Sequence, residues 1–222
     1  MSKATVDSPE KISEQEPKQS YWRIITNKYI RPAVVLTLLL TILTGLIYPG
    51  VVTAIAQLVF PYQANGSLHY VNGKLVGSDL IGQYWTSAKY FHGRPSATVS
   101  AATGTPAPYA ADNSTASNLG PTSKVLIQTV QQNVAELKKE NPNAPRGPVP
   151  VDLVTASGSG LDPDISIAAA LYQVPRIAAA RGLSRNIVQQ LIMDHVHGRF
   201  LGIFGEPYLN VLELNLTLDA LK

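Results

Sequence analysis

The chain lacks cysteine altogether and has few charged residues. Charged residues make up 15% of its 222 positions, hydrophobic residues 45% and aromatic residues 7%. The absence of cysteine excludes disulfides, thiolate metal sites and cysteine nucleophiles. Lys and Arg number 18 against 15 Asp and Glu, and a formal charge of +3 is too small to indicate nucleic acid as a partner. What remains informative is the distribution of apolar segments and turns.

One long segment, residues 33–59, contains no charged residue. At about 1.5 Å per residue it would reach roughly 40 Å as a helix, which exceeds the ~30 Å hydrocarbon core of a bilayer. The segment contains fifteen Leu, Ile and Val, and each favours insertion by about 0.3 to 0.6 kcal/mol. The sequence therefore predicts a transmembrane helix over residues 32–59.

Basic residues lie on one side of this segment only. The next Lys or Arg after it is Lys74, whereas four lie just before it: Lys18, Arg23, Lys28 and Arg31. Positively charged flanks stay in the cytoplasm. We therefore expect a single-pass protein of the cell inner membrane, with residues 1–31 as a basic cytoplasmic tail and residues 60–222 as an extracytoplasmic domain.

A cleaved signal peptide is the alternative interpretation of the same segment. Ala54-Ile55-Ala56 before Gln57 matches the small-x-small pattern of cleavage sites. Cleavage there would leave a soluble exported protein. The region before the apolar run is about thirty residues long, which is long for a signal peptide.

Small residues within the apolar segment indicate a packing face. Thr37, Thr41 and Gly45 recur every four residues and so share one side of a helix. Small residues at this spacing let another membrane helix approach closely. Pro49 lacks the N–H that would bond Gly45, so a kink is expected there.

The residues after the apolar segment predict a single mixed α/β domain. Asn72-Gly73, flanked by residues 68–71 and 74–77, indicates a β-hairpin with a type I′ turn. Residues 92–122 are rich in Ala, Ser, Thr, Gly and Pro, and predict a long loop.

Four further elements are expected in the second half of the domain. Thr122 is the predicted cap of a helix whose apolar stripe is Leu126, Val130, Val134 and Leu137. Residues 149–155 suggest a short strand. Asp162-Pro163 predicts the start of a helix through Gln173, broken or kinked at Pro175 and ended by Gly182. Ser184 is a predicted cap of a helix that ends at Gly198, with five inward residues: Ile187, Val188, Leu191, Ile192 and Val196.

The end of the chain, residues 209–219, alternates between leucine and polar residues. Four leucines, Leu212, Leu214, Leu216 and Leu218, are separated by Glu213, Asn215 and Thr217. Strict alternation is typical of a strand with one buried face. We therefore expect a half-buried strand here.

Candidate catalytic residues are few. Ser157-Gly158-Ser159-Gly160 could form a phosphate loop, but no GxxxxGK[ST], GxSxG or HExxH is present. Asp164 would favour a helix dipole, and His195 and His197 point to different sides of a helix, a poor arrangement for a metal. Two hypotheses remain: a non-catalytic accessory subunit, or a membrane-anchored extracytoplasmic hydrolase or binding protein that uses Asp152, Asp162, Ser157 or His195.

Several stretches taken together resemble one family. They are RPA at 31–33, TGLIYPG at 44–50, AQLVFPYQANGSL at 56–68, GSDLIGQYW at 77–85, YFHGRPSAT at 90–98, SNLGPTS at 117–123, VPVDLVTASGSGLDPDISIAAALYQVPRIAAARGL at 149–183 and GEPYLNVLELNLTLD at 205–219. From Arg31 onward the chain resembles the C subunit of the bacterial Kdp potassium-transporting ATPase.

The resemblance implies an accessory, non-catalytic role in a high-affinity potassium uptake complex. Its partners would be an ATPase subunit, a channel-like potassium-binding subunit and a small fourth membrane peptide. The subunit would act as a catalytic chaperone that raises the ATP affinity of the ATPase subunit, and would stabilise the complex. It would have no cofactor of its own and no metal, and any ATP would be bound through or with the ATPase subunit.

The resemblance also suggests where nucleotide could be bound. The candidate residues are Ser117, Asn118, Gly120, Ser157, Gly158, Ser159 and Gly160. The family tends to carry Gly-Gly just before SNLGPT, whereas this chain has Thr115-Ala116, which allow fewer backbone angles. The predicted topology moreover places the domain outside the cell, whereas ATP is inside.

Overall fold

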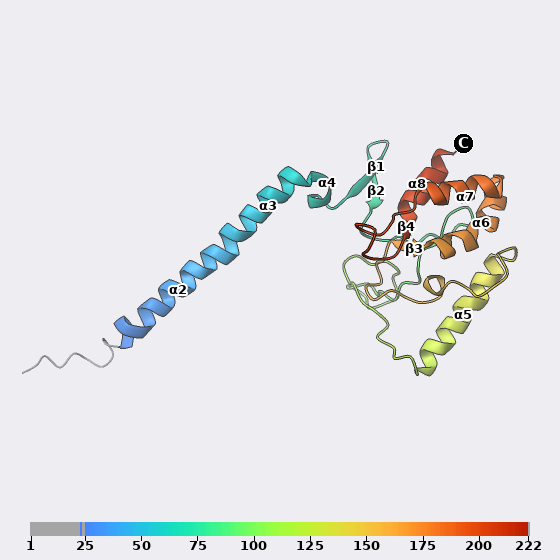
Figure 1. Ribbon diagram of the computed structural model, residues 1–222. Coiled ribbons are helices and arrows are strands. Elements are labelled where there is room, and N and C mark those ends of the chain that lie inside the picture. The colour runs from blue at the N-terminus through green and yellow to red at the C-terminus, as the bar shows by residue number, and fades with distance from the viewer. Residues whose placement is uncertain (1–22, 24, 222) are drawn as a thin grey trace, which may run out of the picture. The chain divides into compact units, whose positions relative to one another are not determined.

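The chain divides into two compact units, residues 1–60 and 61–222. The computed structural model describes residue 23 and residues 25–221 (Figure 1). Most of the predicted cytoplasmic tail therefore lies outside the described residues.

The first unit contains one helix, Thr26–Val59, which among the described residues is the one long and apolar enough to cross a membrane. It consists of four consecutive segments: η1 (Thr26–Ile30), α2 (Arg31–Ile42), η2 (Leu43–Ile47) and α3 (Tyr48–Val59). No residue of these segments is buried within the chain. The prediction of a membrane helix is confirmed in length and composition, although the helix begins before residue 32.

A π-helical turn directly precedes Pro49, the position at which the sequence predicts a kink. Pro49 stands at the start of α3, directly after η2. The Tyr48 N–H bonds the carbonyl of Leu43, five residues back, instead of the usual four. The wider π turn accommodates the missing proline N–H, and the helix continues to Val59.

The second unit begins with the short helix α4 (Pro61–Ala64), followed by the predicted hairpin. Strand β1 (Leu68–Val71) pairs antiparallel with β2 (Lys74–Ser78). Asn72 and Gly73 have φ angles of +51° and +76°, which a type I′ turn requires. A local dipeptide signal was sufficient to predict this element correctly.

Helix α5 (Lys124–Glu140) carries the predicted apolar stripe, and its buried residue is Leu137. Its cap is Ser123 and not Thr122, because the Ser123 hydroxyl accepts a hydrogen bond from the Leu126 N–H. The long segment 92–122 forms no helix or named strand, as expected.

Two predictions for residues 149–173 were wrong. The expected strand at 149–155 is a single 3-10 turn, η3 (Val151–Leu153), and the expected helix start at Asp162 is instead the short strand β3 (Asp164–Ser166). Strand β3 pairs with β4 (Tyr208–Asn210), from a distant part of the sequence. This pairing delays the helix until Ser166, whose hydroxyl caps it by accepting from Ala169 N–H.

The helix that follows, α6 (Ile167–Arg181), lies at the centre of the core. Pro175 does not end it: the helix runs on to Gly182, which adopts the left-handed conformation expected of a C-terminal glycine. Ser184 caps α7 (Arg185–Asp194) as predicted, but this helix stops at Asp194 and not Gly198. Ile187 is exposed, contrary to prediction, whereas Val188 and Ile192 are buried.

The predicted C-terminal strand is a helix, α8 (Val211–Ala220). Four of the five residues that it buries follow the helical spacing i, i+3, i+4 and i+7, namely Val211, Leu214, Asn215 and Leu218, and the fifth is Leu212. Two of the alternating leucines, Leu214 and Leu218, also fit this helical spacing. Asn210 caps the helix by accepting from the N–H groups of Leu212 and Glu213, which favours a helix over a continued strand.

Candidate functional site

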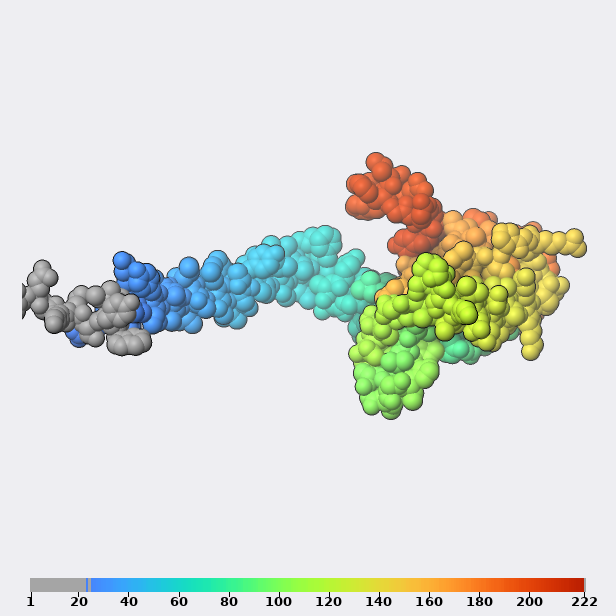
Figure 2. Space-filling model, turned by 90° about the horizontal axis from the view of Figure 1, so that it is seen from below, coloured from blue at the N-terminus to red at the C-terminus, as the bar shows by residue number. Residues whose placement is uncertain are grey.

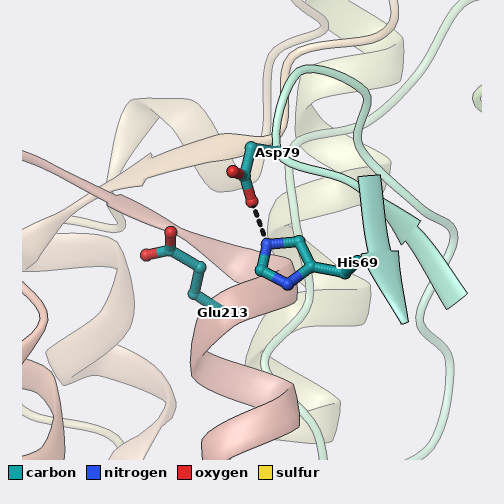
Figure 3. Close-up of side chains that lie close together, drawn as sticks. All are labelled: His69, Asp79 and Glu213. Atoms are coloured by element: carbon teal, nitrogen blue, oxygen red, sulfur yellow. Dashed lines mark hydrogen bonds and ion pairs between the residues drawn. The ribbon is translucent and has the colours of Figure 1, made fainter. Parts of the chain in front are cut away.

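A cluster of ionisable side chains joins the hairpin to the C-terminal helix. His69 lies on β1, Asp79 directly follows β2, and Glu213 lies on α8. The His69 Nε2 and an oxygen of Asp79 form a close contact, and Glu213 faces them (Figure 3). One ligand atom from each of the three lies within 4.8 Å of the others.

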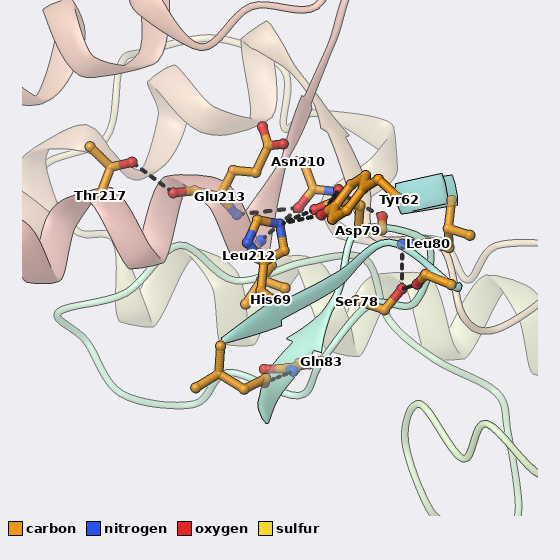
Figure 4. Close-up of polar contacts among 12 residues, drawn as sticks. Tyr62, His69, Ser78, Asp79, Leu80, Gln83, Asn210, Leu212, Glu213 and Thr217 are labelled. Carbon is orange, nitrogen blue, oxygen red and sulfur yellow. Dashed lines mark hydrogen bonds and ion pairs between the residues drawn. The ribbon is translucent and has the colours of Figure 1, made fainter. Parts of the chain in front are cut away.

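A tyrosine completes one side of this cluster. The Tyr62 hydroxyl, from α4, donates to Asp79 Oδ2 at 2.8 Å and lies 3.3 Å from His69 Nε2 (Figure 4). Partial burial and the hydrogen bond to the Asp79 carboxylate raise the pKa of Tyr62 to about 12. Tyr62 therefore remains a protonated donor throughout the physiological pH range.

Glu213 is held from the opposite side. His197 Nε2 lies 2.9 Å from Glu213 Oε2, and its ring stacks on Tyr208 with centroids 4.9 Å apart. The Asn210 side-chain amide donates to the Asp79 carbonyl at 2.9 Å and to Asp164 Oδ1 at 3.2 Å. Strand β4 and helix α8 are thereby fastened to the end of the hairpin.

The cluster contains the ligand types that divalent cations take. Among the described residues, His69, Asp79 and Glu213 are the one group of three that could hold a metal. Each of the three already has a partner in the cluster or in His197. These contacts join α4 to the hairpin, and a carboxylate oxygen of Glu213, on α8, lies within 4.8 Å of the ligand atoms of His69 and Asp79.

A cavity of about 220 Å³ opens elsewhere in the domain. Its walls include the aromatic rings of Tyr84, Trp85 and Tyr109, together with Arg94 and Glu140. Two buried donors there, Trp85 Nε1 and Arg94 Nε, have no protein partner.

A buried arginine lies beside this cavity. Arg176 donates from Nε to Asn141 Oδ1 at 3.0 Å and from a terminal nitrogen to Gln173 Oε1 at 2.6 Å. Burial lowers the pKa of Arg176 to about 10. Burial, and next the Arg176 charge, lower the pKa of His92. Neutral His92 and charged Arg176 then fix the start of segment 92–122 to α6.

The predicted nucleotide residues fall in two loops with different surroundings. In the first loop, the Ser157 hydroxyl accepts from the Gly160 N–H at 2.9 Å, and the Ser159 hydroxyl accepts from the Leu161 N–H at 3.1 Å. Gly158 is exposed, whereas Gly160 is buried with φ +69°. Both hydroxyl groups thus complete turns within their own loop.

The second loop, with Ser117, Asn118 and Gly120, is exposed. Its Asn118 side chain donates to the Ala116 carbonyl at 3.3 Å. The first loop contacts the two residues that precede the second loop. The Ser159 carbonyl accepts from the Thr115 N–H at 3.1 Å and from the Ser114 hydroxyl at 3.0 Å. The two predicted loops are therefore connected through residues 114–115.

The candidate hydrolase residues do not form a catalytic group. Asp152 accepts from the Ser166 N–H at 2.7 Å, and Asp162 pairs with Arg94 at 2.9 Å. His195 is bonded by Leu191 carbonyl and the Thr217 hydroxyl. All four candidates, Asp152, Asp162, Ser157 and His195, lie in the described part of the chain, and none hydrogen-bonds another. A nucleophile next to its base is what hydrolysis by these residues would need.

The structure thus combines a helix long and apolar enough to span a membrane with a mixed α/β domain whose polar groups mainly hold its own segments in place. The family model for the K+-transporting ATPase, c chain (KdpC), matches residues 30–220, and the chain belongs to this family. It is accordingly a subunit of a potassium-transporting ATPase.

Curated relatives agree with this assignment over nearly their full length. The chain is 58% identical to the potassium-transporting ATPase KdpC subunit of Rhodopseudomonas palustris, covering 88% of this chain and 99% of the relative. The corresponding subunit of Bradyrhizobium diazoefficiens is 56% identical, with 86% and 96% covered. That of Methylobacterium nodulans is 55% identical, with 87% and 98% covered.

Proposed function

We propose that this chain is a non-catalytic accessory subunit that raises the ATP affinity of the ATPase subunit and stabilises the potassium uptake complex. Its membership in the KdpC family over residues 30–220 carries the proposal. The Ser157 hydroxyl accepts from the Gly160 N–H, and among the described residues no hydrogen bond links it to Asp152, Asp162 or His195, which argues against hydrolysis by the chain alone.

The proposed partners are the ATPase subunit, the channel-like potassium-binding subunit and a small fourth membrane peptide. The membrane helix has no buried residue within its own chain, so its side chains remain available to other helices. Thr37, Thr41 and Gly45 form the proposed contact face, because small residues permit close approach in lipid.

The domain acts on the ATPase subunit indirectly in this proposal. Basic residues before the helix favour a cytoplasmic N-terminus, so the domain lies outside and ATP inside. A domain that binds one conformation of the pump more tightly than another shifts its equilibrium. A difference of about 1–3 kcal/mol changes apparent ATP affinity roughly 5- to 150-fold without contact to nucleotide.

Direct nucleotide binding is the competing mechanism. It would use the loops with Ser117 and Ser157, and ATP would have to displace the hydrogen bond from the Gly160 N–H to the Ser157 hydroxyl. Within the described residues no Lys follows Gly160 to bind phosphate as in a P-loop. We therefore favour the indirect mechanism.

Affinity purification tests the assignment. A tagged full-length chain is recovered from gently solubilised membranes of cells that express the whole complex, and co-eluting proteins are identified by mass spectrometry. We expect the ATPase and channel-like subunits in stoichiometric yield, and a higher ATP affinity of the complex with the chain than without it. Elution of the chain alone would contradict the proposal.

A further inference from the structure

The residues between α7 and β4 form an apolar projection, here called the knob and defined as residues 200–204. Four of its side chains are large, apolar and mostly exposed: Phe200 72%, Leu201 73%, Ile203 72% and Phe204 62%. In Figure 2 the red segment near residue 200 on the colour bar stands out from the rest of the domain. Apolar groups concentrated at one projection mark an interaction site more often than scattered ones do.

The backbone of the knob is held in a fixed shape. Phe200 and Phe204 exchange backbone hydrogen bonds of 2.9 and 3.0 Å. His197 and Tyr208 form a second such pair nearer the domain, at 2.9 and 3.1 Å. A loop closed by two consecutive pairs presents its side chains with little ordering left to do on binding.

Leu201 shows that the knob is unfavourable for the isolated domain. Its φ of +53° places a bulky residue in the left-handed region, and its side chain is exposed. With 73% of Leu201 exposed, packing within the domain does little to offset this backbone strain. Such a combination is typical of a segment whose partner lies in another molecule.

The base of the knob is acidic. Arg199 donates to both oxygens of Glu206, at 2.9 and 2.7 Å, so these two charges offset each other. Glu213 lies 2.9 Å from His197. Two carboxylates, Glu206 and Glu213, therefore stand against one arginine, Arg199, at the base of the knob.

This charge selects between two classes of partner. Segments that insert into lipid surfaces carry Lys and Arg beside their apolar residues, which attract anionic headgroups. The carboxylates at the base oppose such contact. A protein recess with an apolar floor and a basic or donor-rich rim complements both the knob and its base.

We propose that the knob seats in an apolar recess with a basic rim on another subunit of the potassium-transporting ATPase. This inference rests on the proposed function, because it needs the chain to be assembled with partner subunits. The aromatic residues Phe200 and Phe204 would be the buried anchors, and Glu213, the carboxylate that Arg199 does not offset, would face the rim.

Site-specific crosslinking tests the inference in the full chain. Benzoylphenylalanine replaces Phe204 in cells that express the whole complex, and Val151, 69% exposed on η3, is the matched control position. After irradiation we expect an adduct with one pump subunit, identified by mass, at least about tenfold above the control. Adducts with lipid alone or with a second copy of the chain, or no adduct above the control, would overturn the inference.

A charge substitution gives a second readout. Phe204→Asp places a carboxylate in the proposed recess, and we expect recovery of the partner subunits to fall roughly tenfold or more. Val151→Asp serves as control, and both variants should melt as the parent does. Unchanged recovery with Phe204→Asp would overturn the inference while the proposed function stood; elution of the unmodified parent alone would overturn both.

Discussion

The side-chain amide of Asn215 bonds both backbone polar groups of Phe91, a residue 124 positions earlier. Its oxygen accepts from the Phe91 N–H at 2.8 Å, and its nitrogen donates to the Phe91 carbonyl at 3.0 Å. Both residues are fully buried. One side chain on α8 thus replaces the strand partner that the backbone of the loop at Phe91 lacks.

Replacing this amide should destabilise the domain. Asn215→Leu keeps the volume but leaves the Phe91 N–H and C=O buried without partners, at about 1–3 kcal/mol each. We expect the free energy of unfolding to fall by about 2–5 kcal/mol, measured by denaturant unfolding of the full chain in detergent. Asn186→Leu, at an exposed position of α7, is the control and should change it by less than about 0.5 kcal/mol. Equal stability of the two variants would remove the role assigned to Asn215.

Asp164 should make stability depend on pH. Burial, and next the charge of Asp162, raise the pKa of Asp164 from 3.8 to about 6. The folded chain therefore holds this proton more tightly than the unfolded chain, and ionisation costs stability as pH rises from about 4 to 6. The cost is complete above pH 6 and absent below about pH 4.

Removing that charge should stabilise the domain at neutral pH. Asp164→Asn keeps an acceptor for the Asn210 amide, and we expect a gain of about 1 kcal/mol at pH 7.5, since partial exposure screens the full shift. The gain should vanish at pH 4 in melting experiments. Asp112→Asn, an exposed control, should show no such trend. A loss of stability at pH 7.5 would contradict the assignment.

The membrane helix should be sensitive to bulk at Gly45. A side chain added there meets no heavy atom of its own chain within 4 Å. Gly45→Leu should therefore leave the isolated chain intact and weaken recovery of the partner subunits more than Leu39→Ala does, because it separates packed helices. Equal recovery of the complex with both variants would exclude Thr37, Thr41 and Gly45 as the contact face.

The purified chain should neither hydrolyse nor bind ATP appreciably. The hydroxyl groups of Ser157 and Ser159 accept hydrogen bonds from backbone N–H groups of their own loop. We expect no saturable binding below about 1 mM in equilibrium measurements on the full chain in detergent. Saturable binding that is lost in Ser157→Ala or Ser117→Ala would support the direct mechanism instead.

Sequence alone predicted the elements whose signals are local. Asn72-Gly73 indicated the hairpin, and Ser184 the start of α7, because turn and cap chemistry involves only neighbouring residues. Near the C-terminus the spacing of apolar residues fits two structures, because Leu214 and Leu218 match the two-residue period of a strand and also the period of a helix. Contacts with distant residues, such as Asn215 with Phe91, determine which one forms.

The candidate site depends still more on distant contacts. His69, Asp79 and Glu213 match no catalytic or metal-binding motif, and Glu213 is far from the other two in sequence. The pairing of β3 with β4 fixes the start of α8 and so brings Glu213 to the hairpin. The knob carried a sequence signal, six residues without charge between Arg199 and Glu206, but its exposure required the structure.

Indirect action on the ATPase subunit is tested most directly by determining on which side of the membrane the domain lies. Because the chain has no cysteine, single cysteines at Ser2 and at exposed Ala101 can be labelled with a membrane-impermeant thiol reagent. The experiment uses intact cells, with lysed cells as the labelling control. We predict that Ala101→Cys is labelled in intact cells and Ser2→Cys only after lysis. Labelling of Ser2→Cys but not Ala101→Cys in intact cells would place the domain beside ATP and contradict the account.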